Sequence, residues 1–137
     1  MNRLAAIVVT ILFSVALSAQ DTAKVVFYRY RALKGSGRRT TINVDGKRVC
    51  SLVNGRFFEI TLPAGEHEFS GPDKAKGGKL TLEAGKTYYF ATRPNFERLF
   101  QLQNVWAIFP VSREQGSFEI TSLKPLEGDD IAPEYRK

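Results

Sequence analysis

Residues 41–69, TINVDGKRVCSLVNGRFFEITLPAGEHEF, decide the fold, because three tight turns divide them into four short strands. Asp-Gly at 45–46 and Asn-Gly at 54–55 are preferred pairs for two-residue hairpin loops, since both residues of each pair accept positive φ. Leu-Pro-Ala-Gly at 62–65 fits a type I turn closed by a glycine bulge. Short strands separated by turn signals about every ten residues predict a β-sandwich or a barrel.

The first turn sets the register of its two strands. It places Val44 opposite Lys47. Continuing the same pairing places Ile42 opposite Val49. The strand after the second turn alternates, so one of its faces is expected to be buried. The residues on that face are Phe58, Ile60 and Leu62.

Strands are also predicted on both sides of this stretch. Residues 23–31 alternate as a first strand, and 79–83 with 87–92 form another hairpin across an Ala-Gly turn. Residues 105–111, VWAIFPV, form a strongly apolar strand that Pro110 places at an edge or a bulge. The result is an all-β fold, a single antiparallel β-sandwich of about seven to nine short strands.

Residues 112–124 permit two interpretations. Ser112 followed by Gln115 fits a helix capping box, whereas Phe-Glu-Ile-Thr at 118–121 alternates as a strand would. We favour one short C-terminal helix. The following residues, 125–137, contain Pro, Gly and several acids, and we expect a flexible tail there.

The N-terminus has the layout of a secretory signal peptide. A short positive start precedes a mostly apolar run at 4–17, and the small residues Ser18 and Ala19 follow. We predict cleavage after Ala19, with cleavage after Ser18 as the alternative. An uncleaved anchor is less favoured, because a span needs about 20 apolar residues. No Cys follows the apolar run, so the product is not expected to be a lipoprotein.

The chain has 137 residues, which corresponds to one domain. We expect a signal peptide at 1–19, a β-sandwich domain at 20–124 and a flexible tail at 125–137. Residues 94–104 are irregular, because a Pro-Asn pair breaks the preceding strand. The mature protein is expected in the periplasm or the cell envelope, without a transmembrane span.

The chain is basic, with 20 Lys and Arg against 14 Asp and Glu and a formal net charge of +6. Loss of Arg3 with the signal peptide removes one of these positive charges and leaves +5. Asp45 is the only acid between Lys24 and Arg56. A basic exported domain favours an anionic partner such as an acidic glycan, a lipid head group or an acidic protein. The alternative is a solvated surface that maintains solubility.

Two kinds of contact follow from these residues. The candidate face for an anionic partner consists of Arg29, Arg31, Arg38, Arg39 and Arg48. Trp106 is the candidate for an aromatic contact, since outward aromatic residues on strands anchor interfaces. Export argues against nucleic acid as a partner.

The strand pattern resembles a known family. The segments AKVVFYRYR (23–31), INVDGKRV (42–49), LVNGRFFEITLPAGEHEF (52–69) and LTLEAGKTYYF (80–90) occur in the order seen in the bacterial family called domain of unknown function 2846. PEGA-type surface modules share the same succession of strands and turns. The resemblance implies an exported Ig-like or prealbumin-like sandwich, often in envelope proteins, and no activity. At Cys50 the family would have a small residue, often Gly.

Candidate chemical centres are few. His67 is the single histidine, so any Ser-His-Asp triad would need it, and a packed or surface histidine is the simpler interpretation. One His and one Cys do not supply a usual zinc ligand set, and neither a metal nor another cofactor is predicted. Gly-Ser-Gly at 35–37 leads into a strand, which argues against phosphate binding at a helix N-terminus. Cys50 lies mid-strand, where we expect a buried and inert thiol.

Two functional hypotheses of different classes result. The first is a non-enzymatic binding or interaction module of the bacterial cell envelope. The alternative is a small periplasmic hydrolase that uses His67 with a carboxylate. A third hypothesis is a purely structural domain with an apolar partner contact at Trp106.

Overall fold

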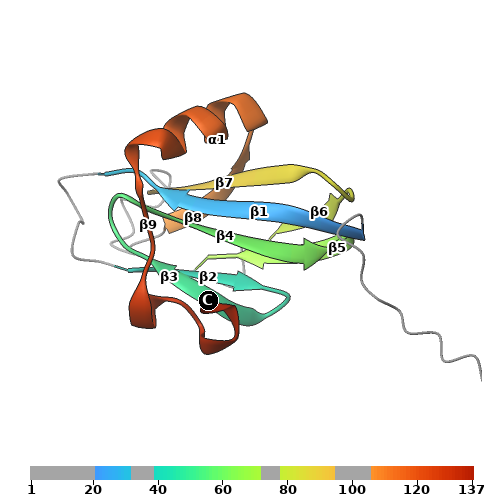
Figure 1. The fold of residues 1–137 in the computed structure, drawn as a ribbon, viewed down its shortest axis with the longest axis horizontal. Coiled ribbons are helices and arrows are strands. Elements are labelled where there is room, and N and C mark those ends of the chain that lie inside the picture. The colour runs from blue at the N-terminus through green and yellow to red at the C-terminus, as the bar shows by residue number, and fades with distance from the viewer. Residues whose placement is uncertain (1–20, 32–38, 72–77, 95–105) are drawn as a thin grey trace, which may run out of the picture.

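The computed structural model of the chain describes residues 21–31, 39–71, 78–94 and 106–137 (Figure 1). Within these ranges nine strands form two sheets that pack face to face. The predicted β-sandwich of about seven to nine strands is confirmed. The predicted signal peptide at 1–19 lies outside the described residues, as do positions 95–104. None of the helices in the described part is long and apolar enough to cross a membrane.

The two sheets have different strand orders. Sheet A contains, from edge to edge, β8 (Trp106–Val111), β7 (Thr87–Pro94), β1 (Thr22–Arg29), β4 (Arg56–Pro63) and β9 (Lys124–Pro125). Sheet B contains β3 (Lys47–Leu52), β2 (Thr40–Val44), β5 (Gly65–Ser70) and β6 (Gly78–Leu82). The pairs β1–β7 and β4–β9 run parallel and the remaining pairs antiparallel, so the sandwich is mixed where a purely antiparallel one was expected.

Most of the tight turns connect the two sheets, where the sequence predicted hairpins within one sheet. The turn at 54–55 leads from β3 to β4, the one at 62–65 from β4 to β5, and the one at 84–85 from β6 to β7. The fourth turn, Asp-Gly at 45–46, closes a hairpin within sheet B, and Val44 pairs with Lys47 as predicted. The others become corners, because each next strand buries its apolar face against the opposite sheet.

A β-bulge changes the register of the β2–β3 hairpin. Asn43 pairs with Arg48, but Ile42 pairs with Cys50, so Val49 is the extra residue and the predicted Ile42–Val49 pair is wrong. The bulge lets two consecutive residues face the interior, and both Val49 and Cys50 are fully buried.

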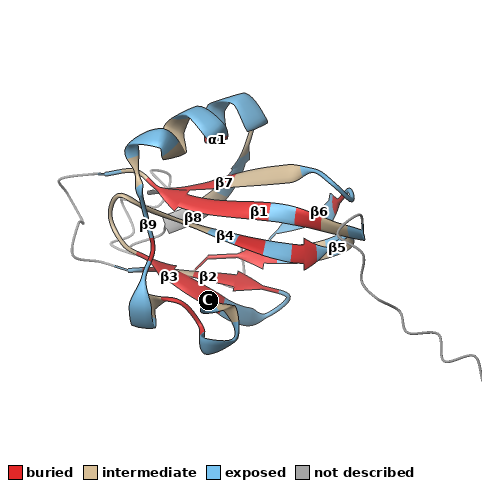
Figure 2. Ribbon diagram, viewed as in Figure 1, coloured by how far each residue is buried: buried red, intermediate tan, exposed pale blue. Residues whose placement is uncertain are grey.

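The core lies between the sheets (Figure 2). Three aromatic rings from β1, β5 and β7 form its centre: the ring centroids of Phe27 and Phe90 are 5.7 Å apart, and those of Phe69 and Phe90 are 4.6 Å apart. The predicted inner face of β4 is confirmed, since Ile60 and Leu62 are buried and Phe58 packs against the same cluster.

The favoured short helix is present as α1 (Arg113–Glu119). Its N-cap is Ser112, whose Oγ accepts a hydrogen bond from the Gln115 N–H at 3.2 Å. The helix covers the outer face of sheet A, where Gly116 lies directly on the Tyr89 ring. A Cβ at position 116 would overlap that ring, so only glycine allows this close approach.

Residues 124–137, here called the C-terminal strap, pack against the sandwich, in contrast to the flexible tail expected from 125. β9 pairs with the edge of β4, and further along the strap Ile131 bridges Cys50 on the edge of β3. The apolar side chains of Leu126, Ile131 and Ala132 are buried. These three residues are interspersed with Pro, Gly and acids, which concealed their contribution to the core. The strap thereby covers one edge of each sheet (Figure 1).

Candidate functional site

Arg29, predicted on a contact surface, is fully buried. It shares the inward face of β1 with Phe27, as alternation requires. Its Nη1 donates to Thr40 Oγ1 and to the Leu52 carbonyl, both at 3.4 Å. Desolvation lowers the pKa of its guanidinium. Arg29 is therefore an internal residue that links the two sheets, and it is removed from the predicted face.

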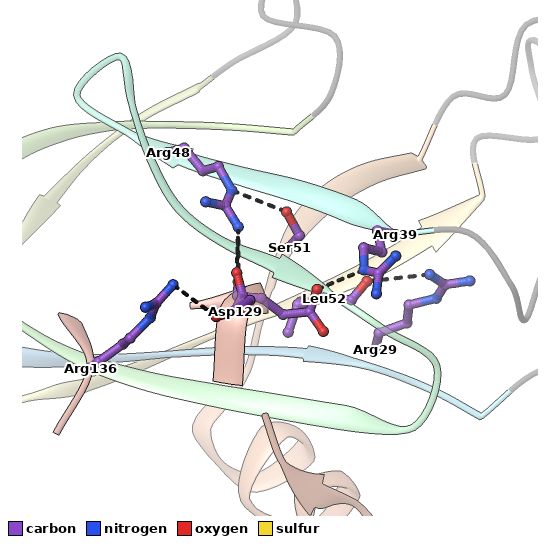
Figure 3. A network of polar contacts seen from close by, with 8 residues as sticks. Arg29, Arg39, Arg48, Ser51, Leu52, Asp129 and Arg136 are labelled. Carbon is purple, nitrogen blue, oxygen red and sulfur yellow. Dashed lines mark hydrogen bonds and ion pairs between the residues drawn. The ribbon is translucent and has the colours of Figure 1, made fainter. Parts of the chain in front are cut away.

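Arg39 and Arg48 are exposed, but both contact the strap (Figure 3). Arg39 Nε lies 2.6 Å from Asp130 Oδ1. Arg48 Nη2 donates to the backbone carbonyls of Asp129 and Asp130, each at 3.3 Å, and its Nε donates to Ser51. Both cations thus find acceptors, a carboxylate for Arg39 and backbone carbonyls for Arg48, in the segment that was expected to be flexible.

A third cation belongs to the strap itself. Arg136 Nε donates to the Ile131 carbonyl at 2.9 Å, and its Nη2 lies 3.5 Å from Asp129 Oδ1. We call this arrangement of Arg39, Arg48, Arg136 and the two aspartates the strap clamp (Figure 3).

The remaining predicted contact residues do not join the clamp. Arg31 is exposed beside the turn at Gly55. Arg38 lies outside the described residues. Trp106 begins β8, and its side chain is likewise outside the described part. The structure thus divides the predicted face into an interior arginine, an occupied clamp and an isolated Arg31.

His67 is held by two acceptors. Its Nδ1 donates to Asp45 Oδ2 and its Nε2 donates to the Pro63 carbonyl, both at 2.7 Å. An imidazole that donates to both acceptors at once is the charged imidazolium, so these two partners favour the protonated form. Partial burial lowers the pKa of His67, but the hydrogen bonds to Asp45 and Pro63 and the charge of Asp45 outweigh it, so the pKa lies above its usual value.

Asp45 is fixed equally firmly. It has a positive φ of 51° in the hairpin turn, and its Oδ1 accepts from the Glu68 N–H at 2.9 Å. Desolvation raises the pKa of Asp45. The hydrogen bonds from Glu68 and His67 and the charge of His67 lower it by more, so the pKa lies below its usual value. His67 and Asp45 therefore form a charged pair that staples β5 to the β2–β3 turn.

Cys50 is buried, as predicted, and desolvation raises the pKa of its thiol to about 12. A thiol with this pKa is a poor nucleophile at neutral pH. In the described ranges, no group of three or more His, Cys, Asp or Glu residues is arranged to hold a metal ion.

A basic hollow, which the sequence analysis missed, lies at one end of the outer face of sheet A. Two adjoining depressions of about 430 and about 300 Å³ share the residues of the β6–β7 turn. Together they are lined by Thr22, Lys24, Thr61, Gly85, Lys86, Thr87 and Arg113.

Strand register assembles the hollow. Lys24 on β1 pairs with Thr61 of β4 on one side and with Thr87 of β7 on the other. The turn is tied to β1 by hydrogen bonds from the Gly85 N–H to the Thr22 carbonyl, 2.8 Å, and from the Lys24 N–H to the Lys86 carbonyl, 3.0 Å. No local motif joins residues so far apart in the chain. The lining residues of the hollow could have been found only by knowing that β1 lies between β4 and β7.

An apolar groove of about 470 Å³ lies between β4 and the strap. Phe57, Phe58, Leu126 and Tyr135 line it, together with charges of both signs at its rim, including Glu59 and Arg136. The mixed rim selects neither anions nor cations.

These features define a small β-sandwich protein with a self-occupied basic clamp, a charged histidine staple and an open basic hollow. A family model described as "Protein of unknown function (DUF2846)" matches residues 19–99, and the chain belongs to this family. The match contains Lys24 and Lys86, whereas α1 with Arg113 and the strap lie beyond it. No curated protein and no solved structure matches the chain.

Proposed function

We propose that this protein is exported and acts as a non-enzymatic binding module of the bacterial cell envelope, with an anionic partner. The observation that carries the proposal is the basic hollow. Lys24, Lys86 and Arg113 come from three different parts of the chain and line two adjoining exposed depressions, which share Lys86. The signal-peptide pattern at 1–19 and the net charge of +5 that remains after its removal, one less than the full chain's +6, support export to anionic surroundings.

The geometry of His67 favours this proposal over a hydrolase. A general base needs one ring nitrogen that is free to accept a proton from a nucleophile. In this fold Nδ1 donates to Asp45 and Nε2 donates to Pro63. The raised pKa of His67 further favours the protonated form, which cannot act as a base.

The test is co-sedimentation of the exported protein with isolated cell envelopes at low and at high salt. We expect binding at low salt that is lost at high salt, because the contact is between exposed charges. The informative variant is Lys24→Gln, Lys86→Gln and Arg113→Gln combined.

The matched control removes three exposed cations elsewhere, Lys47→Gln, Lys79→Gln and Lys124→Gln. Both triple variants have the same net charge, so loss of sedimentation in the first alone assigns the contact to the hollow. Sedimentation that survives high salt, or no sedimentation at either salt, would contradict an anionic partner. An active product in a hydrolase screen that His67→Ala abolishes would restore the enzymatic alternative.

A further inference from the structure

The lining of the basic hollow identifies the class of its ligand, on the basis of the proposed function. Its residues are of two chemical kinds besides Gly85. Three are cations, and the other three are the threonines Thr22, Thr61 and Thr87. Among the described lining residues there is no aromatic or aliphatic side chain.

The threonines are placed for a ligand that carries hydroxyl groups. Thr61 and Thr87 flank Lys24 in the row β4–β1–β7, on the face of sheet A that is turned away from the core. Their neighbours Ile60, Leu62 and Tyr88 point to the opposite side, into or against the core. A cation between two hydroxyls can bind an acidic group and an adjacent hydroxyl of the same ligand.

The cations have only exchangeable partners. Lys24 lies 3.8 Å from Glu59, with side chains 61% and 46% exposed. Lys86 pairs with Glu83, and both side chains are 62% exposed. The side chain of Arg113 makes no hydrogen bond or ion pair within the part of the chain that the structure describes. Exposed pairs of this kind contribute little free energy, so an anionic ligand can displace them.

The extent of the hollow favours an elongated ligand over a single small ion. The two depressions share Gly85, Lys86 and Thr87 and continue from Lys24 on one side to Arg113 on the other. An extended ligand with several anionic groups can contact cations at both ends. A membrane surface would instead call for apolar side chains beside the cations, to enter the interface.

We propose that the basic hollow binds an acidic glycan segment, whose carboxylates or phosphates contact Lys24, Lys86 and Arg113 and whose hydroxyls contact Thr61 and Thr87. The binding is non-covalent and involves no reaction. Glu83 is expected to compete with the ligand, because its carboxylate forms an ion pair with Lys86 in the absence of ligand.

The test is calorimetric titration of the exported protein with trigalacturonate as the acidic probe and maltotriose as the neutral probe of equal length. We expect trigalacturonate to bind and maltotriose not to bind. The triple variant of the hollow should lose about tenfold or more in affinity, whereas the Lys47, Lys79 and Lys124 control should keep it.

Two further variants separate a glycan site from a general attraction of charge. Glu83→Gln removes the competitor and should raise affinity several-fold, while the Lys86 N–H still donates to the backbone carbonyl of residue 83. Thr61→Val with Thr87→Val preserves shape and charge and should weaken trigalacturonate binding. Circular dichroism and the unfolding midpoint confirm that each variant is folded.

The failures of the two proposals are distinguishable. Salt-sensitive envelope binding without any trigalacturonate binding would overturn the glycan assignment and leave the anionic partner standing. Binding to vesicles of phosphatidylglycerol through the same three cations, with no glycan binding, would identify a lipid surface instead. Unchanged affinity in the two-threonine variant would show that charge alone acts, and would also overturn the assignment.

Discussion

The strap clamp and the basic hollow are both basic, but they differ in what faces their cations. In the clamp, Arg39 and Arg48 contact Asp130 and two backbone carbonyls of the same chain. In the hollow, Lys24 and Lys86 meet only exposed glutamates at the rim. The clamp uses its charge to hold an edge-covering segment, whereas the charge of the hollow remains available to a ligand.

A high density of basic residues in the sequence therefore does not locate a binding surface. The sequence has its richest basic stretch around Arg38 and Arg48, and the fold brings the strap acids to it. The hollow draws its cations from three separate regions, and its two acids, Glu59 and Glu83, form only exposed pairs with them. An available charge is therefore a property of topology more than of local composition.

The largest effect should come from loosening the strap. Ile131→Ala removes a side chain that is buried against Cys50, and we expect the free energy of unfolding to fall by about 2–4 kcal/mol. Urea unfolding measures the loss. Reaction of Cys50 with a thiol reagent under native conditions should also accelerate, because the strap covers it.

Phe118→Ala is the control for that variant. Phe118 is 78% exposed on α1, and we expect a change within about 0.5 kcal/mol. Equal stability and equal thiol reactivity in Ile131→Ala and the parent chain would mean that the strap is not packed against β3.

A smaller effect is expected where α1 carries Arg113 to the hollow. Gly116→Ala would place a methyl group in the Tyr89 ring and should cost about 1–3 kcal/mol in unfolding free energy. Because the helix must move away, affinity at the hollow should fall as well. Ser117→Ala, at the next and exposed position, should leave the unfolding free energy and the affinity nearly unchanged. Equal values in the Gly116→Ala and Ser117→Ala variants would contradict the close packing of α1 on Tyr89.

The clamp can be measured through its most direct ion pair. A double-mutant cycle with Arg39→Ala and Asp130→Ala should give a coupling of about 0.2–1 kcal/mol, since the side chains are 64% and 23% exposed. Salt should reduce it. The pair Lys79–Glu66, 3.8 Å apart with both side chains over 60% exposed, serves as reference and should couple less. Equal coupling in the two pairs would remove the distinction between the clamp and an ordinary surface contact.

The smallest effect concerns His67 and Asp45, a charged pair in neither region. Since the folded pKa of His67 is raised above 6.5, its contribution is present below that pH and is lost as the pH rises through the folded pKa. Since the folded pKa of Asp45 is lowered below 3.8, its contribution is present above that pH and is lost as the pH falls through the folded pKa. The pair should therefore stabilise most between roughly pH 4 and 6.5.

Asp45→Asn keeps the turn conformation, because Asn also accepts positive φ. The parent chain should exceed this variant in unfolding free energy by no more than about 1 kcal/mol near pH 5.5, and by less near pH 8.5. An NMR titration of the imidazole should show a pKa that falls in the variant. A difference that grows with rising pH would contradict the charged pair.

The sequence predicted well what depends on neighbouring residues. Turn positions, the inner face of β4 and the cap of α1 follow from local chemistry: Gly and Asp45 adopt positive φ in the turns, and the Ser112 side chain bonds a free N–H. It failed where the answer depends on distant partners. An Asn-Gly turn at 54–55 fits a hairpin and a sheet-to-sheet corner equally well, because the turn does not specify what its strands will pair with.

The candidate site was less predictable than the fold. Arg29 lies two residues after Phe27 and shares its face of β1, so strand alternation alone would have placed the side chain inside, but the charge argued for the surface. The strap was missed because its buried residues follow no regular period between Pro and Gly. The hollow required the parallel pairing of β1 with β7, which no local pattern announces.

β1 is the first described strand along the chain, yet it lies in the middle of sheet A, between β4 and β7. Both of its partner strands lie far along the chain from β1, so β1 can pair only after distant segments have come together with it. Domains dominated by such pairings fold in roughly milliseconds to seconds. During that interval Val25, Val26 and Phe27 form an apolar strand with two open edges, which invites pairing between different chains. Efficient production of this protein should therefore depend on chaperones that shield residues 22–29 until β7 is available.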